Sequence, residues 1–338
     1  MFYKASRRRA SLDAARRSAC ATSFAIIQSV KPRSSFWQVG LLLVLCAAAV
    51  FGFLRWRSSR DYDAARLVET LPRNGGAIVY LDFATLKSAG LLDALAATKA
   101  TEESDYRKFV QDSGFDYRSD MEAVAVAFDN GNMYATARGK FQWKRLSDYA
   151  RANGGACKDD ICQMPASQPG RFVSFYLLRS NVLALAVSPD PHGVDLINPP
   201  QGKTIFRSSE PVALSAPGSA FEKPGAALPP GAQAFLSPLA KAVRVTFYAG
   251  SATGDKAKLS LRLDAECATP EVAQELAKQL QSTTLLLKNM LAREKMTPSP
   301  GDLSGLLVAG TFEAKDVRVA GNWPLDRRFV EGLLIGGE

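Results

Sequence analysis

The sequence predicts an α+β protein in which a single N-terminal transmembrane helix precedes two modules, each made of an antiparallel sheet and helices. Three observations lead to this prediction. Residues 36–54 form a run of 19 residues without a charged side chain. The rest of the chain alternates short strand-like runs with amphipathic helical runs. Each half follows one order: a strand, a helical segment, two strands, a helix, two strands and a helix.

The apolar run Phe36–Leu54 is long enough to cross a bilayer. Its 19 residues, at about 1.5 Å of helical rise each, approach the roughly 30 Å thickness of the hydrocarbon core. Trp37 and Trp56 lie at its two ends, where indole rings favour the headgroup region. Arg55 and Arg57 can extend their charges to the same interface. We therefore predict a membrane anchor with these four residues at the interface and the lipid bilayer as a partner.

The charge distribution predicts how this anchor is oriented. Residues 1–35 carry eight basic residues and one acidic residue, a net charge of +7, whereas residues 55–338 carry 34 basic and 32 acidic residues, a net charge of +2. The positive-inside rule places the N-terminus in the cytoplasm and the bulk of the chain outside it, as in a single-pass protein of the inner membrane. Cleavage after the small residues Ala47–Ala49 is the alternative, but Val50–Leu54 stays apolar, which favours an uncleaved anchor. Because the excess cations lie in the tail, we expect no nucleic-acid binding by the main body.

Composition and turn signals divide the chain into five parts. Residues 1–35 are a basic tail that we expect to be disordered in the cytoplasm, and the predicted span covers residues 36–54. The first α+β module covers residues 61–198. Residues 199–230 are rich in Pro and Gly and form a connection, and the second α+β module covers residues 231–338.

Local signals predict several elements within the modules. The pair Asn130-Gly131 predicts a tight hairpin, because both residues tolerate positive φ. A short strand is expected near Val212–Leu214, and a further strand over Leu303–Phe312. Thr269-Pro270-Glu271 predicts the start of a long helix, since Thr caps the N-terminus and Pro fits the first helical position. That helix is expected to reach about Lys295.

Two resemblances refine these expectations. Two strands, a helix and two more strands are similar to the order in ferredoxin-like α+β sandwiches. The step Leu71-Pro72, the strand Ala77–Phe83 and the run Gly90–Leu95 resemble the opening of uncharacterised membrane-anchored bacterial envelope proteins of the DUF3352-like kind, over about thirty residues. This resemblance implies an anchored extracytoplasmic domain and supplies no catalytic residue.

Cys157 and Cys162 are separated by four residues in a segment that we expect outside the cytoplasm, where disulfides persist. The charged pair Asp159-Asp160 between them is typical of a hairpin tip, so we predict a disulfide. The spacing does not match the Cys-x-x-Cys redox motif. No histidine or further cysteine lies nearby to complete a zinc site.

Residues that could carry chemistry are few, and a non-catalytic explanation fits each of them. His192 is the only histidine, which excludes sites with several histidine ligands. Gly202-Lys203-Thr204 is like the end of a phosphate loop, but Ile197 stands where that motif needs glycine. The remaining carboxylate groupings fit turns and solvated loops: Asp116 with Asp120, Asp129 to Asn132, and Asp159-Asp160. We therefore predict no catalytic, cofactor-binding or metal-binding residues and no enzyme activity.

The function expected from these observations is that of a membrane-anchored extracytoplasmic binding or scaffolding protein whose partner is another envelope protein. One alternative is a subunit of a secretion, pilus or cell-division assembly. The other is an envelope enzyme without a recognisable motif. A polar pocket with perturbed carboxylates would favour the enzyme, whereas an exposed apolar patch or an open sheet edge would favour the partner.

Overall fold

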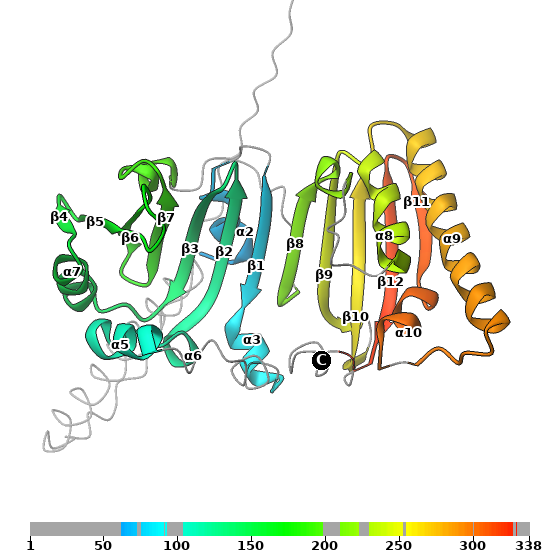
Figure 1. Ribbon diagram of the computed structural model, residues 1–338, viewed down its shortest axis with the longest axis horizontal. Helices are drawn as coiled ribbons and strands as arrows, with labels where there is room; N and C mark the ends of the chain where they lie inside the picture. The colour runs from blue at the N-terminus through cyan, green and yellow to red at the C-terminus, as the bar shows by residue number, and fades with distance from the viewer. Residues whose placement is uncertain are drawn as a thin grey trace, which may run out of the picture. The chain divides into compact units, whose positions relative to one another are not determined.

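The computed structural model describes residues 62–72, 76–90, 92, 104–198, 210–222, 230–252, 255–299, 301–326 and 329. Twelve strands in these residues form one antiparallel sheet, in the order β11-β12-β10-β9-β8-β1-β2-β3-β7-β6-β5-β4 (Figure 1). The basic tail, the predicted span and the interface residues Trp37, Arg55, Trp56 and Arg57 lie outside the described residues.

The first half of the chain supplies seven of the strands, and the second half supplies five. The strands are β1 (Ala77–Asp82), β2 (Met121–Asp129), β3 (Asn132–Gly139), β4 (Ala156–Lys158), β5 (Ile161–Pro165), β6 (Phe172–Arg179), β7 (Val182–Ser188), β8 (Val212–Pro217), β9 (Arg244–Ala252), β10 (Asp255–Glu266), β11 (Thr311–Lys315) and β12 (Arg318–Leu325). The helices are α2 (Ala64–Glu69), α3 (Phe83–Ser88), α5 (Ser104–Ser113), α6 (Tyr117–Asp120), α7 (Trp143–Ala152), α8 (Pro230–Leu236), α9 (Pro270–Arg293) and α10 (Leu303–Val308), with 3-10 turns η2 (Gly193–Leu196), η3 (Gly218–Phe221) and η4 (Ser237–Lys241).

Both halves follow the same path through the sheet. In the first half, β1, β2 and β3 form a meander, α7 follows, and the chain returns so that its last strand, β7, pairs with β3. In the second half, β8, β9 and β10 form the meander, α9 and α10 follow, and the last strand, β12, pairs with β10. The order of elements read from the sequence is thus repeated up to the helix that follows the meander; after it the first half has four strands, β4 to β7, and the second half has two, β11 and β12.

The prediction of two ferredoxin-like modules is wrong. A ferredoxin-like module contains βαβ units, in which the strands on either side of the helix run parallel. Every strand pair among the described residues is antiparallel, and a single sheet contains strands from both halves. The order of elements in the sequence does not encode strand direction, and the prediction failed on this point.

Strand β8 is the reason why the sheet is continuous. Leu214 of β8 lies opposite Val79 of β1 on one side and opposite Phe247 of β9 on the other. This strand confirms the short strand expected near Val212–Leu214, but its place at the centre of the sheet was not predicted, because the segment around it was taken as a connection between two modules. Pro211 precedes it and Pro217 is its last residue, and the prolines of this segment favoured the prediction of a connection between modules.

The predicted single-pass topology and inner-membrane localisation are also contradicted. Among the described residues, no helix has both the length and the apolar character needed to cross a bilayer. The 24-residue helix α9 buries one side against the sheet and carries charged residues among those on its exposed side. The apolar side chains of the described residues are instead divided among sheet strands and amphipathic helices.

The predicted strand over residues 303–312 divides into helix α10 and strand β11. The Asp302 side chain caps α10 by accepting hydrogen bonds from the backbone N–H groups of Ser304 (2.9 Å) and Gly305 (3.2 Å). A short capped helix therefore occupies the apolar run Leu303–Val308, because the Asp302 cap satisfies N–H groups that a helix start leaves unpaired.

The two faces of the sheet are covered at different places. Successive strand residues point to opposite faces, so Ala184 and Leu185 of β7 belong to different cores. On one face, α2 and η2 pack on β1, β2, β3 and β7, with Leu67 and Val194 fully buried. On the other face, α7 covers the β5–β6 end, and α8 with α9 covers β9, β10 and β12 (Figure 1).

Candidate binding surface

The middle of the second face carries aligned apolar side chains. Val79 of β1 lies opposite Val126 of β2 and Leu214 of β8, and Leu81 lies opposite Val124 and Val212. Across β2 and β3, Phe128 lies opposite Met133. We call this set the central apolar face; it consists of Val79, Leu81, Val124, Val126, Phe128, Met133, Val212 and Leu214.

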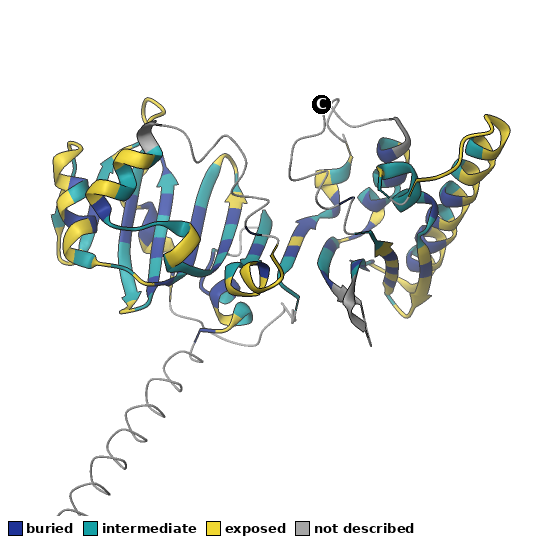
Figure 2. Ribbon diagram, turned by 90° about the horizontal axis from the view of Figure 1, so that it is seen from below, coloured by how far each residue is buried: buried dark blue, intermediate teal, exposed yellow. Residues whose placement is uncertain are grey.

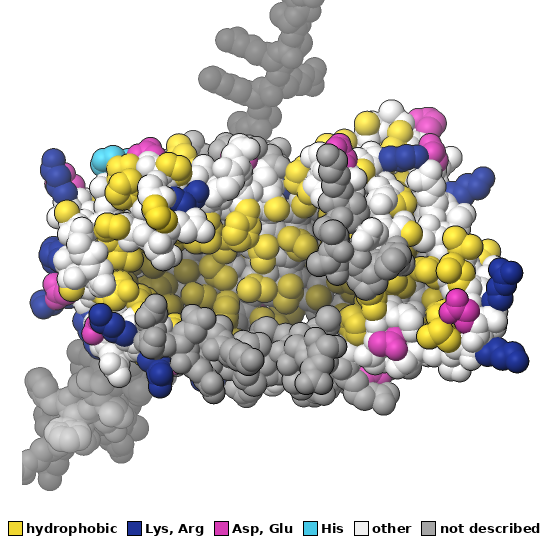
Figure 3. Space-filling view, viewed as in Figure 1, with side chains coloured by type: hydrophobic (Ala, Val, Ile, Leu, Met, Phe, Trp, Pro, Cys, Tyr) yellow, Lys and Arg dark blue, Asp and Glu magenta, His cyan; other side chains and the backbone are white. Residues whose placement is uncertain are grey.

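These side chains keep contact with solvent. Phe128 is 47% exposed and Leu214 is 40% exposed, while the other six are intermediate in exposure. Figure 3 shows apolar atoms gathered over the central strands, in a hollow between the helices at the two ends of the sheet. The described residues therefore leave a contiguous apolar surface accessible, and such surfaces on folded proteins commonly mark interaction sites.

The central apolar face continues into the two covered cores on either side of it. The row formed by Leu214, Val79 and Val126 continues across β3 to Leu185 of β7, which packs in the core beneath α7. In the other direction this row continues to Phe247 of β9, which packs in the core beneath α9. The helices on this side of the sheet thus form a layer that is present at both ends. The middle strands offer the same kind of surface to a further element.

The outer edges of the sheet are less suited to binding. Strand β11 forms one edge, and Glu313 and Lys315 on it are charged residues of the kind that oppose strand addition. In addition, the Gln281 side-chain amide of α9 donates a hydrogen bond of 2.8 Å to the Phe312 carbonyl oxygen. The other edge strand, β4, has only three residues. A short or charged edge is a poor template for another strand.

The predicted disulfide joins the edge strands β4 and β5. Cys157 and Cys162 lie opposite each other, with their sulfur atoms 1.98 Å apart. Asp159 and Asp160 form the turn between them at φ values of 49° and 64°, as expected for a tight hairpin tip. Cys162 is fully buried against α7, so the disulfide lies at the edge of this core.

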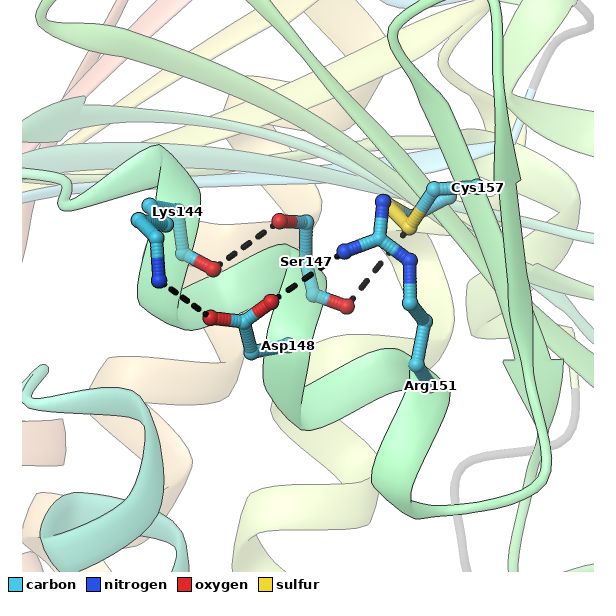
Figure 4. Close-up of polar contacts among 6 residues, drawn as sticks. Lys144, Ser147, Asp148, Arg151 and Cys157 are labelled. Carbon is cyan, nitrogen blue, oxygen red and sulfur yellow. Dashed lines mark hydrogen bonds and ion pairs between the residues drawn. A yellow bond between two sulfur atoms is a disulfide. The ribbon is translucent and has the colours of Figure 1, made fainter.

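The surface of α7 beside the disulfide carries a small ionic cluster. Asp148 accepts hydrogen bonds of 3.1 Å from both Lys144 and Arg151, and the Cys157 sulfur lies 3.7 Å from the Ser147 carbonyl oxygen (Figure 4). All three charged side chains are more than half exposed. Exposed pairs of this kind contribute only about 0–1 kcal/mol, so we assign this cluster to helix stability rather than to a site.

The other residues singled out in the sequence serve local structure. The His192 side chain is 63% exposed and lies 3.8 Å from Asp195. Asn130 and Gly131 adopt φ values of 48° and 77°, which confirms the predicted hairpin turn. Asp116 caps α6 by accepting a hydrogen bond from the Arg118 N–H group (2.9 Å). Within the described ranges no group of three or more His, Cys, Asp or Glu side chains could hold a metal ion. Gly202 to Thr204 lie outside the described residues.

The pKa shifts follow burial and capping. Burial raises the pKa of the Tyr80 hydroxyl to about 12. Hydrogen bonds lower the pKa values of three carboxyl groups: Glu271 from Thr269, Glu275 from Lys241 and Asp302 from Ser304. A general acid in an active site needs an upward shift instead, so these three carboxylates do not fit that role.

Sequence reasoning did not identify the central apolar face, although β2 carries a signal for it. Residues 123–128 of this strand are all apolar, and such a strand needs cover on both faces. Ala123, Ala125 and Ala127 obtain it from the core beneath α2. Val124, Val126 and Phe128, on the other face, are the residues that remain accessible.

Comparisons with known proteins identify no family for this chain. No protein-family model matches the sequence, and no curated protein matches it either. Three solved structures, each a crystal form of TP0453, match at 10% sequence identity. Form III has a TM-score of 0.46 and covers 79% of this chain and 97% of that chain. Form IV (0.44; 80% and 96%) and form I (0.44; 82% and 98%) are comparable. A likeness at this level indicates neither a shared function nor a shared partner.

Proposed function

We propose that this chain is a binding or scaffolding protein of the cell envelope and that the central apolar face holds its partner. The single observation that carries the proposal is the accessible apolar surface over β1, β2, β3 and β8. Leaving apolar area in water costs roughly 25 cal/mol per Å². A partner that covers this area gains that free energy on binding.

The partner surface that fits best is the apolar side of an amphipathic helix. Strands β1 and β8 have hydrogen-bonded neighbours on both sides, so a partner cannot join the middle of the sheet as a further strand. It has to pack on side chains. Helices already cover this face at both ends, and a helix placed between them would complete the layer in the usual arrangement of helices on a sheet.

The disulfide supports an envelope setting. Disulfides persist in oxidising compartments and are rare in the cytosol. Cys157 and Cys162 are oxidised in this structure, and we therefore propose another envelope protein as the partner. A subunit role in a larger secretion, pilus or cell-division assembly would use the same surface in the same way.

Site-specific photocrosslinking in intact cells tests the proposal. A photoreactive residue at Phe128 should crosslink to a partner segment whose sequence has an apolar stripe at helical spacing. The substitution Leu214→Glu should abolish that crosslink, because it places a charge in the middle of the face. A photoreactive residue at Leu196, which is 51% exposed on η2, serves as the control position and should not capture the same segment.

Two results would contradict the proposal. One is a crosslink from Phe128 only to residues of the same chain, which would mean that the protein covers this face itself. The other is a partner crosslink that survives Leu214→Glu unchanged.

A further inference from the structure

The C-terminal half of α9 exposes large apolar side chains. Its N-terminal half is fixed to the sheet by Leu276 and Leu280, which are fully buried. Beyond residue 284, Leu285 is 58% exposed, Leu286 is 59% exposed and Met290 is 49% exposed. The outer side of this helix faces solvent along its length (Figure 2). A helix that packs one side on a sheet usually carries polar residues on its outer side, so leucine and methionine there are unusual.

The outer residues of α9 follow the spacing of a coiled-coil seam. Steps of four, three, four, three and four residues connect six positions: Glu275, Gln279, Ser282, Leu286, Asn289 and Arg293. Five of the six are exposed, and Gln279 is intermediate. Alternating steps of three and four keep side chains on one side of a helix, where they can meet a second helix. The seam changes along its length from acidic and small to apolar and basic.

We infer that two copies of this chain associate through an antiparallel pair of α9 helices. If the two helices cross at residue 284, Glu275 meets Arg293, Gln279 meets Asn289, and Ser282 meets Leu286. Each contact then occurs twice, as two-fold symmetry requires. Each contact is also chemically matched: opposite charges, two amides that can exchange hydrogen bonds, and a large apolar side chain over a small one.

A groove beside the N-terminal half of α9 provides room for the partner copy. It is open to solvent, has a volume of about 470 Å³ and is lined by Pro238, Glu275, Lys278, Gln279, Ser282 and Thr283. Leu286 and Met290 of the second copy would fill it. An antiparallel pair also places the positive end of each helix dipole beside the negative end of the other.

The α9 seam and the central apolar face are different surfaces, so this inference is independent of the proposed function. The seam lies on the outer side of α9, whereas the central apolar face is formed by β1, β2, β3 and β8. A dimer would present two central apolar faces. Two linked binding surfaces can hold a partner array more tightly than either surface alone.

Disulfide trapping in the full-length protein tests the pairing directly. A copy with Ser282→Cys is mixed with a copy with Leu286→Cys under mild oxidation, and a crosslinked dimer is expected on a non-reducing gel. Replacing Leu286→Cys by Ala292→Cys, which is exposed but off the seam, should remove most of the crosslink. The unsubstituted chain measures the background from its own cysteines.

Charge reversal gives a second, independent readout. Sedimentation of the full-length protein should show a dimer that Glu275→Arg or Arg293→Glu weakens and that the double variant restores. Leu286→Glu should raise the dimer dissociation constant about tenfold or more, because the centre of an interface carries most of its affinity. The thermal unfolding temperature of the Leu286→Glu variant should hardly change, since Leu286 is exposed. Glu275 also forms an ion pair of 2.7 Å with Lys241 of the same chain. Thermal unfolding of the Glu275→Arg variant therefore shows whether loss of that pair changes its stability.

A monomer at all concentrations would overturn the inference. So would a dimer that Leu286→Glu leaves intact, or one in which positions 282 and 292 crosslink as readily as positions 282 and 286.

Discussion

Adding volume at Ala125 should destabilise the fold, whereas the same side chain at the adjacent residue should not. Ala125 is 0% exposed. It lies opposite Tyr80 on β1 and Thr136 on β3 in the core beneath α2. Val126 points to the opposite face and belongs to the central apolar face. The pair Ala125→Ile and Val126→Ile therefore compares a closed core with an accessible surface on one strand.

The expected magnitude follows from how firmly α2 is held. The Thr136 hydroxyl of β3 donates a hydrogen bond of 2.8 Å to the Leu67 carbonyl oxygen of α2, and the Thr70 hydroxyl at the end of α2 donates one of 3.2 Å to the Thr136 hydroxyl. Helix α2 cannot move outward without breaking these buried bonds. Overpacking a closed core costs about 1–3 kcal/mol, and we expect the upper part of this range for Ala125→Ile. Val126→Ile should stay within about 0.5 kcal/mol of the unsubstituted protein.

Thermal unfolding followed by circular dichroism measures both variants. Each kcal/mol corresponds to about 2–4 °C in a protein of this size, so Ala125→Ile should lower the unfolding temperature by about 4–12 °C. Equal melting temperatures for the two variants would refute the assignment of the two faces. A larger loss for Val126→Ile would mean that the central apolar face is closed within the free protein.

Three further predictions concern the disulfide at the sheet edge, the N-terminal cap of α10 and a close backbone contact at Gly218. Replacing Cys157 and Cys162 together by serine should lower the free energy of unfolding by about 2 kcal/mol, the value for a loop this short; an unchanged melt under oxidising conditions would count against the bond. Asp302→Asn should destabilise the protein near neutral pH but not in acid. Hydrogen bonds lower the pKa of Asp302 in the folded state. The stabilisation that its carboxylate provides is therefore present above the unfolded-state pKa of about 3.9 and is lost as pH falls through the folded-state pKa. The difference between the two melting curves should therefore vanish in strong acid, and a constant difference would contradict the cap. Gly218→Ala should destabilise strongly, because its Cβ would lie 1.9 Å from the Ala242 carbonyl oxygen, and folding of that variant with an unchanged melting temperature would show that the backbone contact is absent.

Several elements could be predicted because their signals are local. The Asn130-Gly131 turn needs only two residues that tolerate positive φ, and both adopt it. The start of α9 was likewise readable, since the Thr269 side chain caps it and Pro270 occupies the first helical position. The helix ends at Arg293, close to the predicted end.

Predictions that required long-range information failed. The sequence between residues 199 and 230 shows prolines and glycines but does not reveal that β8 pairs with both β1 and β9. The prolines at residues 211 and 217 affect only the ends of that strand. Its central place depends on partners that are more than 100 residues away on one side, and no local pattern encodes that choice.

By itself, the sequence determined many of the strands and helices, the Asn130-Gly131 turn, and that Cys157 and Cys162 are close enough to join, although it predicted a strand where α10 lies. These properties depend on φ preferences, capping groups and apolar periodicity over a few residues. Only the tertiary structure decided that the two halves share one sheet and that the apolar residues of β1, β2 and β8 remain accessible. Periodicity shows that a side chain is apolar, but the packing of distant segments determines whether anything covers it.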